Sequence, residues 1–387
     1  NENVVVNIVP AAQSGQMSQP SEIKSDKATA FFKNKELKKI DLDGNVFVFQ
    51  KPTNKNPKWS KINANRALVQ IEKEVKRLEL FENVTIQTTQ NEAKPTQIKT
   101  SYALYEKDFD KFTLDRGVEI ITVEGNQPAV ITANDAIYEQ KNGLIYLNGN
   151  AEITNGGNYV KGDKLTAELY QSKKLKSAQA FGNGFLRQTT PERTAEISAN
   201  QLNATFNENQ QMQTAKAIGQ SNAVLIPVQN PDYTKVTLLA QNSINLNFRE
   251  NGLLEQMQTD GRTTIVLNAP NNRQDAANKK LTADTVKTFF HANGKDLARA
   301  EAIGNAELYV EPFRNSAENY KTTINAPRFD CEFFEAGNNA KNCSAATKAK
   351  VVRVPTIKNE NRGNQTLIAD RLNATFNKNT QDIEQME

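Results

Sequence analysis

A short strand-like pattern recurs from one end of the chain to the other, and this repetition constrains the fold more than any other feature. The pattern is an apolar residue, any residue, a small residue, two further residues, and then an alternation of apolar or small residues with polar ones. Ten copies begin at Ile23, Ile62, Ile98, Ile131, Val160, Ile197, Leu238, Leu281, Ile324 and Leu367. The starts lie 29 to 43 residues apart, so the loops between copies vary in length. The chain is therefore predicted to be a repeat array and not a set of unrelated domains.

Each copy is predicted to form two bent strands. In one copy an alternation of period two runs through Ile197 and Ala199 and resumes through Leu202, Ala204 and Phe206, with one residue more than strict alternation between the halves. A bulge or sharp bend in this outgoing strand keeps both halves facing inward. A polar, Asn-rich stretch and a second, weaker alternation follow, which is typical of a hairpin with a return strand.

A second bend is predicted in the return strand. Most return strands carry a Gly or Asn followed by a small residue, and both Gly and Asn tolerate positive φ. The instances are Gly44-Asn45-Val46, Asn83-Val84, Gly117-Val118, Gly149-Asn150-Ala151, Gly182-Asn183-Gly184 and Gly304-Asn305-Ala306. V-shaped hairpins stacked edge to edge form two sheets that face each other across an apolar interior. We therefore predict an all-β, elongated, folded-over two-sheet stack with little helix.

The ends of the chain differ from the repeats. Residues 1–22 are predicted to be an N-terminal extended segment and linker, and residues 23–387 one continuous repeat domain whose last unit is incomplete at Glu387. The chain begins without a Met and without a signal peptide, so we expect a targeting segment to precede Asn1.

Composition argues against several classes of function. The net charge is only +4, which is unlike a dedicated nucleic-acid binder, so no nucleic-acid partner is expected. No apolar run approaches the roughly 18 residues of a membrane-spanning helix. One histidine and two cysteines leave little material for a metal site or a His-centred relay, and no carboxylate pair, P-loop or Gly-x-Ser-x-Gly motif is present. We therefore expect no enzymatic activity, no cofactor and no metal.

Two segments carry the whole motif, with its Asp after the small residue and its later Gly-Asn: IKSDKATAFFKNKELKKIDLDGNVFVF (residues 23–49) and VKGDKLTAELYQSKKLKSAQAFGNG (residues 160–184). They resemble the OstA-like family of lipopolysaccharide-transport proteins, which includes LptA, LptC and the periplasmic domain of LptD, and the resemblance covers residues 23–387. It implies a β-jellyroll with an open apolar groove in the periplasm of a Gram-negative envelope. The chain has more units than a typical LptA-like or LptC-like protein, so whether it is LptA-like, LptC-like or a fusion of both stays open.

The resemblance implies a non-enzymatic lipid conduit that binds the acyl chains of lipopolysaccharide and passes them from the inner to the outer membrane. From the pattern alone a closed sandwich core is favoured, whereas the resemblance favours an open groove. The candidate groove residues are the inward positions Ile62, Ala64, Val69, Ile131, Ala133, Val160, Leu165, Ile197, Ala199, Leu202, Ala204, Phe206, Leu281, Ala283, Val286, Phe290, Ile324, Phe329, Phe333, Leu372 and Phe376. The alternative function is a structural β-solenoid scaffold or adhesin stalk with a closed interior, and unequal repeat lengths argue against it.

The expected partners follow from the same resemblance. They are lipopolysaccharide or a related glycolipid, an inner-membrane ABC transporter complex, and other OstA-like bridge components joined end to end. Open strand edges at the first and last units suit such end-to-end joining. A tether to the inner membrane, by a segment outside this chain, is left open.

Cys331 and Cys343 are predicted to form a disulfide. Cys331 occupies the inward position held by Ala204 and Ala374 in other copies, and a hairpin centred on Gly337 pairs residues whose numbers sum to 674, as 331 and 343 do. Cross-strand neighbours share the Cβ separation that a disulfide requires, roughly 4 to 5 Å. An even, minimal cysteine count fits an oxidising compartment such as the periplasm, and two buried free thiols are the alternative.

Three other features have both a structural and a functional interpretation. The pairs Phe31-Phe32, Phe289-Phe290 and Phe333-Phe334 should each place one ring inside and one outside, the outer ring lying under a loop rather than against a partner. His291 is predicted to be a solvated turn residue. The stretch KNKELKK (residues 33–39) and the residues Lys348, Lys350 and Arg353 are interpreted as solvated surface, with contact to lipid phosphates as the alternative.

Overall fold

The computed structural model describes residues 4–8, 19–53, 57–72, 74–89, 95–124, 127–229, 233–270, 277–313, 319–357, 362–379, 381 and 383–387. Every helix or strand position assigned in these ranges belongs to a β-strand, and neighbouring strands pair antiparallel. The predicted all-β class is therefore confirmed. The predicted linker falls largely outside the described residues.

The chain divides into two compact units, Asn1–Ala180 and Phe181–Glu387. The first contains β1 (Val4–Ile8), β2 (Ser21–Ser25), β3 (Lys27–Lys33), β4 (Glu36–Gln50), β5 (Ser60–Glu72), β6 (Glu74–Thr88), β7 (Thr96–Glu106), β8 (Lys111–Glu124), β9 (Gln127–Glu139), β10 (Leu144–Asn155), β11 (Asn158–Leu169) and the start of β12 (Leu175–Thr189). The second contains the rest of β12 and β13 (Arg193–Phe206), β14 (Met212–Ile218), β15 (Ser221–Pro227), β16 (Lys235–Ala240), β17 (Ser243–Phe248), β18 (Leu254–Asp260), β19 (Thr263–Asn268), β20 (Ala277–Ala283), β21 (Thr285–Phe290), β22 (Leu297–Pro312), β23 (Tyr320–Phe333), β24 (Ala340–Pro355), β25 (Gln365–Phe376) and β26 (Ile383–Met386).

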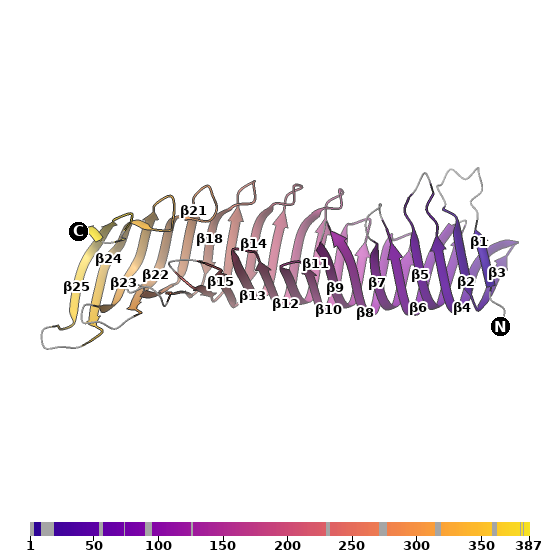
Figure 1. The fold of residues 1–387 in the computed structure, drawn as a ribbon, viewed down its shortest axis with the longest axis horizontal. Coiled ribbons are helices and arrows are strands. Elements are labelled where there is room, and N and C mark those ends of the chain that lie inside the picture. Colours follow the sequence, from indigo (N-terminus) through magenta and orange to yellow (C-terminus); the bar gives the residue numbers. More distant parts are fainter. Residues whose placement is uncertain are drawn as a thin grey trace. The chain divides into compact units, whose positions relative to one another are not determined.

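Most hairpins of the first unit are pairs of long strands that bend at the same level (Figure 1). β5 and β6 pair up to Asn63↔Thr85 and resume at Arg66↔Phe81, so residues 82–84 face residues 64–65. The return strand is therefore one residue longer than its partner at the bend. The predicted extra residue of the outgoing strand is confirmed, because Ala64 and Ala67 lie three positions apart in β5 and are both buried.

The bend divides every hairpin into two arms. The first arm consists of the half of each outgoing strand that precedes the bend, together with the strand segments paired with that half. The second arm consists of the half that follows the bend, with the segments paired with it. In part of the second unit the strands separate at the bend: β13 pairs with β15 in the first arm and with β14 in the second.

Positive φ at two successive residues forms the bend in most return strands. These pairs are Gly44-Asn45, Glu82-Asn83, Arg116-Gly117, Gly149-Asn150, Gly182-Asn183, Gly304-Asn305 and Thr347-Lys348. The predicted second bend is confirmed. The pair Thr347-Lys348 was not predicted, because a β-branched residue and a lysine are unusual in the left-handed region.

The Asp or Asn of the repeat motif packs over this bend. Asn305 Nδ2 donates a hydrogen bond to Asp284 Oδ2 at 3.0 Å, and Asn45 bonds to Asp26 in the same way. A Cβ added to Gly304 would lie 2.4 Å from Asp284 Oδ2. The Asp or Asn of one strand and the Gly-Asn of the next thus form one polar contact on the outside of the bend, which explains why the two motifs occur together.

Burial is deepest beside the bend. From β4 to β10, outgoing strands place Ala and return strands place Leu at this level of the second arm. These residues are Leu42, Ala67, Leu80, Ala103, Leu114, Ala136 and Leu147, each 9% exposed or less. Small side chains beside large ones let neighbouring strands interdigitate, so the core of each unit is a line along the bend.

Candidate lipid-binding interior

The inner face of each arm is organised in rows that run across the strands. Inward side chains lie two positions apart along a strand, so the strand register gives the members of each row. We number the rows from the bend: row 1 adjoins it, and rows 2 and 3 lie successively nearer the free end of the arm.

Row 2 of the first arm is aliphatic in both units and includes predicted groove residues. It contains Val48, Ile62, Ile86, Ile98, Ile120, Ile131, Ile153 and Val160, and in the second unit Ile197, Ala223, Leu238, Ile265, Leu281, Leu308, Ile324, Val351 and Leu367. All of these except Leu238 are partly exposed or exposed, whereas in row 1 beside them Ala64, Ala133, Ala199 and Ala283 are buried. Apolar side chains therefore become more accessible with distance from the bend.

Row 3 of the first arm differs between the two units. In the first unit it contains Gln50, Ser60, Thr88, Thr96 and Thr122, with Thr96 and Thr122 hydrogen-bonded at 3.1 Å. In the second unit it begins with Ala195, Leu225, Val236 and Leu267. The apolar inner face of this arm is thus two rows deep in the first unit and three rows deep in that part of the second.

Phenylalanines occupy the free end of the second arm in the second unit. They are Phe206, Phe248, Phe290, Phe333 and Phe376, each paired with the first residue of the following strand. Every one is partly exposed. Phe248 was not predicted, because its copy carries an extra residue that shifts the pattern.

A stack of three aromatic rings lies in the second arm of the first unit. The ring centroids of Tyr105 and Phe112 are 4.6 Å apart, and those of Phe112 and Tyr138 are 6.4 Å apart. Phe112 is 40% exposed, and burial raises the pKa of Tyr105. Sequence analysis missed this stack because its three residues lie on three different strands, β7, β8 and β9. Equal aromatic spacing across adjacent strands is the signal that could have revealed it.

The predicted groove residues all lie on the inner side, and none is fully exposed. The structure brings several of them together. Ile197, Ala199 and Leu202 share one apolar cluster, Leu281, Ala283, Val286 and Phe329 a second, and Phe329 and Leu372 a third. Their contact with lipid stays a prediction.

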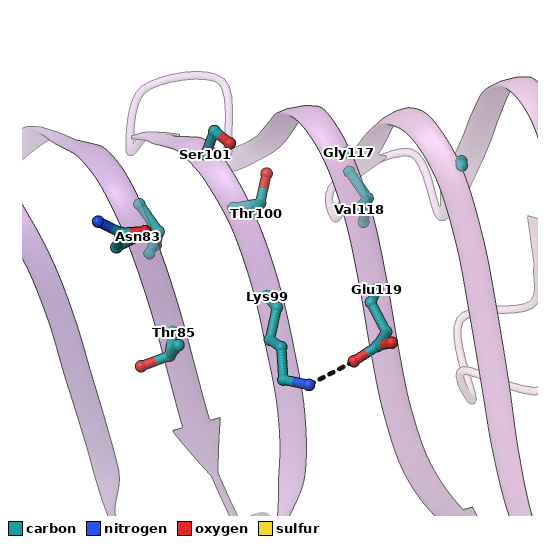
Figure 2. Close-up of a pocket in the computed structure, with 10 residues that line it drawn as sticks. Asn83, Thr85, Lys99, Thr100, Ser101, Gly117, Val118 and Glu119 are labelled. Carbon is teal, nitrogen blue, oxygen red and sulfur yellow. Dashed lines mark hydrogen bonds and ion pairs between the residues drawn. The ribbon is translucent and has the colours of Figure 1, made fainter.

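One depression lies at the bend of β6–β9 and has a volume of about 460 Å³. It is lined by Asn83, Val84, Thr85, Lys99, Thr100, Ser101, Gly117, Val118, Glu119 and Ala133. Figure 2 shows Lys99 joined to Glu119, their charged atoms 2.7 Å apart, beside the bend at Ser101 and Gly117. Ser101 stands where other copies have Asp or Asn, and a Cβ on Gly117 would meet no atom within 4 Å. A gap in the polar cover of the bend therefore accounts for this depression.

A network of ion pairs covers the outer face of the second arm in the second unit. Arg299 and Arg328 both contact Glu301, at 2.9 and 3.1 Å, and both contact Asp330. The hydrogen bond from Arg299 holds the pKa of Asp330 below its usual value. The charges of these four side chains are therefore paired with one another.

His291 and one of the phenylalanine pairs differ from prediction. His291 does lie at a hairpin turn and is partly exposed, but its Nε2 is buried without a hydrogen-bond partner among the described residues. Phe31 and Phe32 are 47% and 67% exposed, because β3 pairs only with β4 among the described residues. Both rings of this pair are therefore accessible.

Cys331 and Cys343 are cross-strand partners in β23 and β24, and a disulfide joins them. The bond lies on the inner face between Ala300 and Ala374, in row 2 of the second arm. It encloses a short loop, since the two residues are 12 positions apart.

Thiol titration of the unfolded, unreduced protein should detect no free thiol. The chain-entropy estimate for a loop of this size is about 3 kcal/mol, which would act mainly on this hairpin. Replacing both cysteines by Ala should therefore loosen the hairpin and leave the fold and lipid binding largely intact. Two reactive thiols per chain would contradict the bond.

Known proteins similar to this chain point to one family. Residues 49–126, about a fifth of the chain, match the family of lipopolysaccharide-assembly, LptC-related proteins. The crystal structure of LptH, described as the LptA-homologous periplasmic component of the lipopolysaccharide transport device of Pseudomonas aeruginosa, matches at 13% identity over 42% of this chain and 83% of that one, with a TM-score of 0.20. A likeness this weak does not by itself define the fold. No curated protein matches.

The architecture is that of an all-β repeat protein built from bent antiparallel hairpins with an apolar inner face. The match to LptC-related proteins confirms the resemblance to the OstA-like lipopolysaccharide-transport family over residues 49–126.

The described ranges of the chain contain no helix long and apolar enough to cross a membrane. These ranges also contain no group of three or more His, Cys, Asp or Glu side chains placed to hold a metal ion.

Proposed function

We propose that the protein is a non-enzymatic lipid conduit that holds the acyl chains of lipopolysaccharide against its inner face and passes them towards the outer membrane. The observation that carries this proposal is that inward side chains are less buried towards the free ends of the arms than beside the bend. In the first arm most row 1 residues are buried, whereas the aliphatic residues of row 2 and the phenylalanines of the second unit keep part of their surface accessible. The LptC-related match supports a role in lipopolysaccharide transport.

The physical requirement is cover for hydrocarbon. Exposing apolar surface to water costs about 25 cal/mol per Å², so an amphiphile with several acyl chains needs a continuous apolar surface while it crosses an aqueous compartment. Repeating rows of Ile, Val, Leu and Phe supply such a surface without a single deep pocket. Acyl chains can then move between equivalent positions with little change in contact.

The periplasm is the compartment in which we place this function. The family is a periplasmic one, and a structural disulfide fits an oxidising compartment. The single repeat domain over residues 23–387 stays a prediction, as does tethering to the inner membrane. The ABC transporter that supplies the lipid is likewise part of the proposal.

End-to-end joining with other OstA-like components is proposed through unpaired strand edges. Among the described residues, β3 pairs only with β4, and the first-arm half of β25 pairs only with β24. Leu367 and Ile368 on that half are 44% and 71% exposed. Edges of this kind accept a further strand from a partner.

The closed scaffold is not favoured. A closed interior would bury row 2 as deeply as row 1, which is not the case in either unit.

A single inward charge tests the conduit. Ile197→Lys places an ammonium group in row 2, and we expect it to lower lipopolysaccharide binding by the purified protein about tenfold, because the charge must be desolvated when acyl chains enter. Ser198→Lys, on the outer side of the same strand, is the matched control and should bind normally. Binding is measured by fluorescence with labelled lipopolysaccharide, after circular dichroism has shown equal folding. Equal binding by both variants would contradict the proposal.

A further inference from the structure

Arg353 faces the inner side of the second unit, unlike its basic neighbours in sequence. It lies in row 3 of the first arm, opposite Thr322 in β23 and Gln365 in β25. Lys350, three residues earlier, faces the outer side, and Lys348 lies in the bend. Of the three basic residues interpreted as solvated surface, only Arg353 therefore stands beside the apolar rows.

The Arg353 guanidinium is held by an aromatic ring. Its Cζ lies 4.3 Å from the ring centroid of Tyr320, and Arg362 approaches the same ring at 5.6 Å. Arg353 Nη1 also donates a hydrogen bond to Gln365 Oε1 at 3.2 Å. A guanidinium has five N–H donors in a fixed plane, so stacking and one hydrogen bond orient it while other donors remain for a ligand.

Among the described residues, those around Arg353 on the inner face carry positive charge only. Within the described strands, the inward first-arm positions of β20 and β22–β25 include no carboxylate, and Arg353 makes no ion pair with a described Asp or Glu. Lys279 occupies the same row three strands away, a distance of about 14 Å. In the first unit the corresponding row bears Gln50, Ser60, Thr88 and Thr96 and is uncharged.

We propose that Arg353, together with Arg362 and Tyr320, binds the phosphate group of an amphiphile whose acyl chains lie against rows 1 and 2. This inference rests on the proposed function. The planar donors of arginine match phosphate oxygens in pairs, and row 3 is the position at which a head group would leave the apolar surface. A phosphate there would fix how the amphiphile is oriented across the inner face.

Competition with a fluorescent fatty acid tests this site in the purified protein. Dodecyl phosphate and dodecyl maltoside carry the same alkyl chain and are compared below their micelle concentrations. We expect the wild type to bind dodecyl phosphate about tenfold more tightly than the maltoside, with the difference shrinking as salt is added. Arg353→Gln should remove most of that preference and leave maltoside binding unchanged. Tyr320→Leu should weaken it about threefold, by releasing the stacked guanidinium.

Lys350→Gln removes the same charge from the outer face of the same strand and is the matched control. Equal loss of phosphate binding in Arg353→Gln and Lys350→Gln would overturn the inference, because only the overall charge would then matter. Displacement by inorganic phosphate alone, at the concentrations that suffice for dodecyl phosphate, would overturn it in favour of a free-phosphate site. If the wild type binds neither amphiphile, the conduit itself fails; if it binds both equally, only the phosphate site fails.

Discussion

Leu238→Asp is expected to lower the free energy of unfolding by about 4 kcal/mol or more, whereas Leu239→Asp should change it by about 0.5 kcal/mol or less. The two leucines are adjacent in β16 but face opposite sides. Leu238 is 7% exposed in the apolar cluster with Ala199, and Leu239 is 46% exposed. A carboxylate at position 238 has no described partner in that cluster and must be desolvated on folding.

Urea unfolding followed by circular dichroism measures this difference, with the midpoints of the two variants compared with that of the wild type. A repeat protein can open locally, so hydrogen exchange across residues 193–268 should show where the loss is concentrated. Similar losses in both variants would mean that the two sides of the strand are equally buried, and the assignment of inner and outer faces would then be wrong.

Gly304→Ala is expected to cost about 3 kcal/mol. Gly304 has a φ of 76°, which is strained for any residue with a Cβ, and the added atom would lie 2.4 Å from Asp284 Oδ2. The second contribution disappears when Asp284 is replaced by Gly. In that background Gly304→Ala should cost only about 1 to 2 kcal/mol, the penalty of the left-handed conformation alone.

The double-mutant cycle separates packing over the bend from backbone conformation. Urea unfolding of the wild type, both single variants and the double variant supplies the four free energies. A coupling energy near zero would show that Asp284 does not pack over Gly304, and the explanation of the repeat motif would fail.

The bends show how far sequence could predict this fold. Gly and Asn adopt positive φ more readily than other residues, so the bends at Gly149-Asn150 and Gly304-Asn305 could be located from sequence. Thr347-Lys348 adopts the same conformation because β24 is held in register by β23 on one side and β25 on the other. Tertiary pairing overrides local preference there, which a single sequence does not reveal.

Sequence could predict which side chains face the inner side, but not how much of each side chain is buried. Alternation predicts which way Ile197 and Leu202 point, and both join the apolar cluster of the second unit. How much of each side chain remains accessible depends on how far the arms separate, which alternation does not encode. The same limit applies to Phe248, whose copy carries an additional residue at the bend between β16 and β17.

The polar and basic groups of row 3 were beyond sequence analysis for a similar reason. Arg353 and Lys350 differ in side only because of strand register, and in the sequence both belong to one basic stretch. The stacking of Arg353 on Tyr320 joins residues that are 33 positions apart.

Photocrosslinking of lipopolysaccharide in cells tests the central claim most directly. A photoreactive amino acid is placed singly at Ile197, Leu202 and Phe206, which face the inner side, and at Asn203 and Thr205, which face the outer side of the same strand. The account predicts lipopolysaccharide adducts at the three inner positions and none above background at the two outer ones. Equal labelling of both sides, or adducts at the outer positions alone, would contradict a lipid conduit along the inner face.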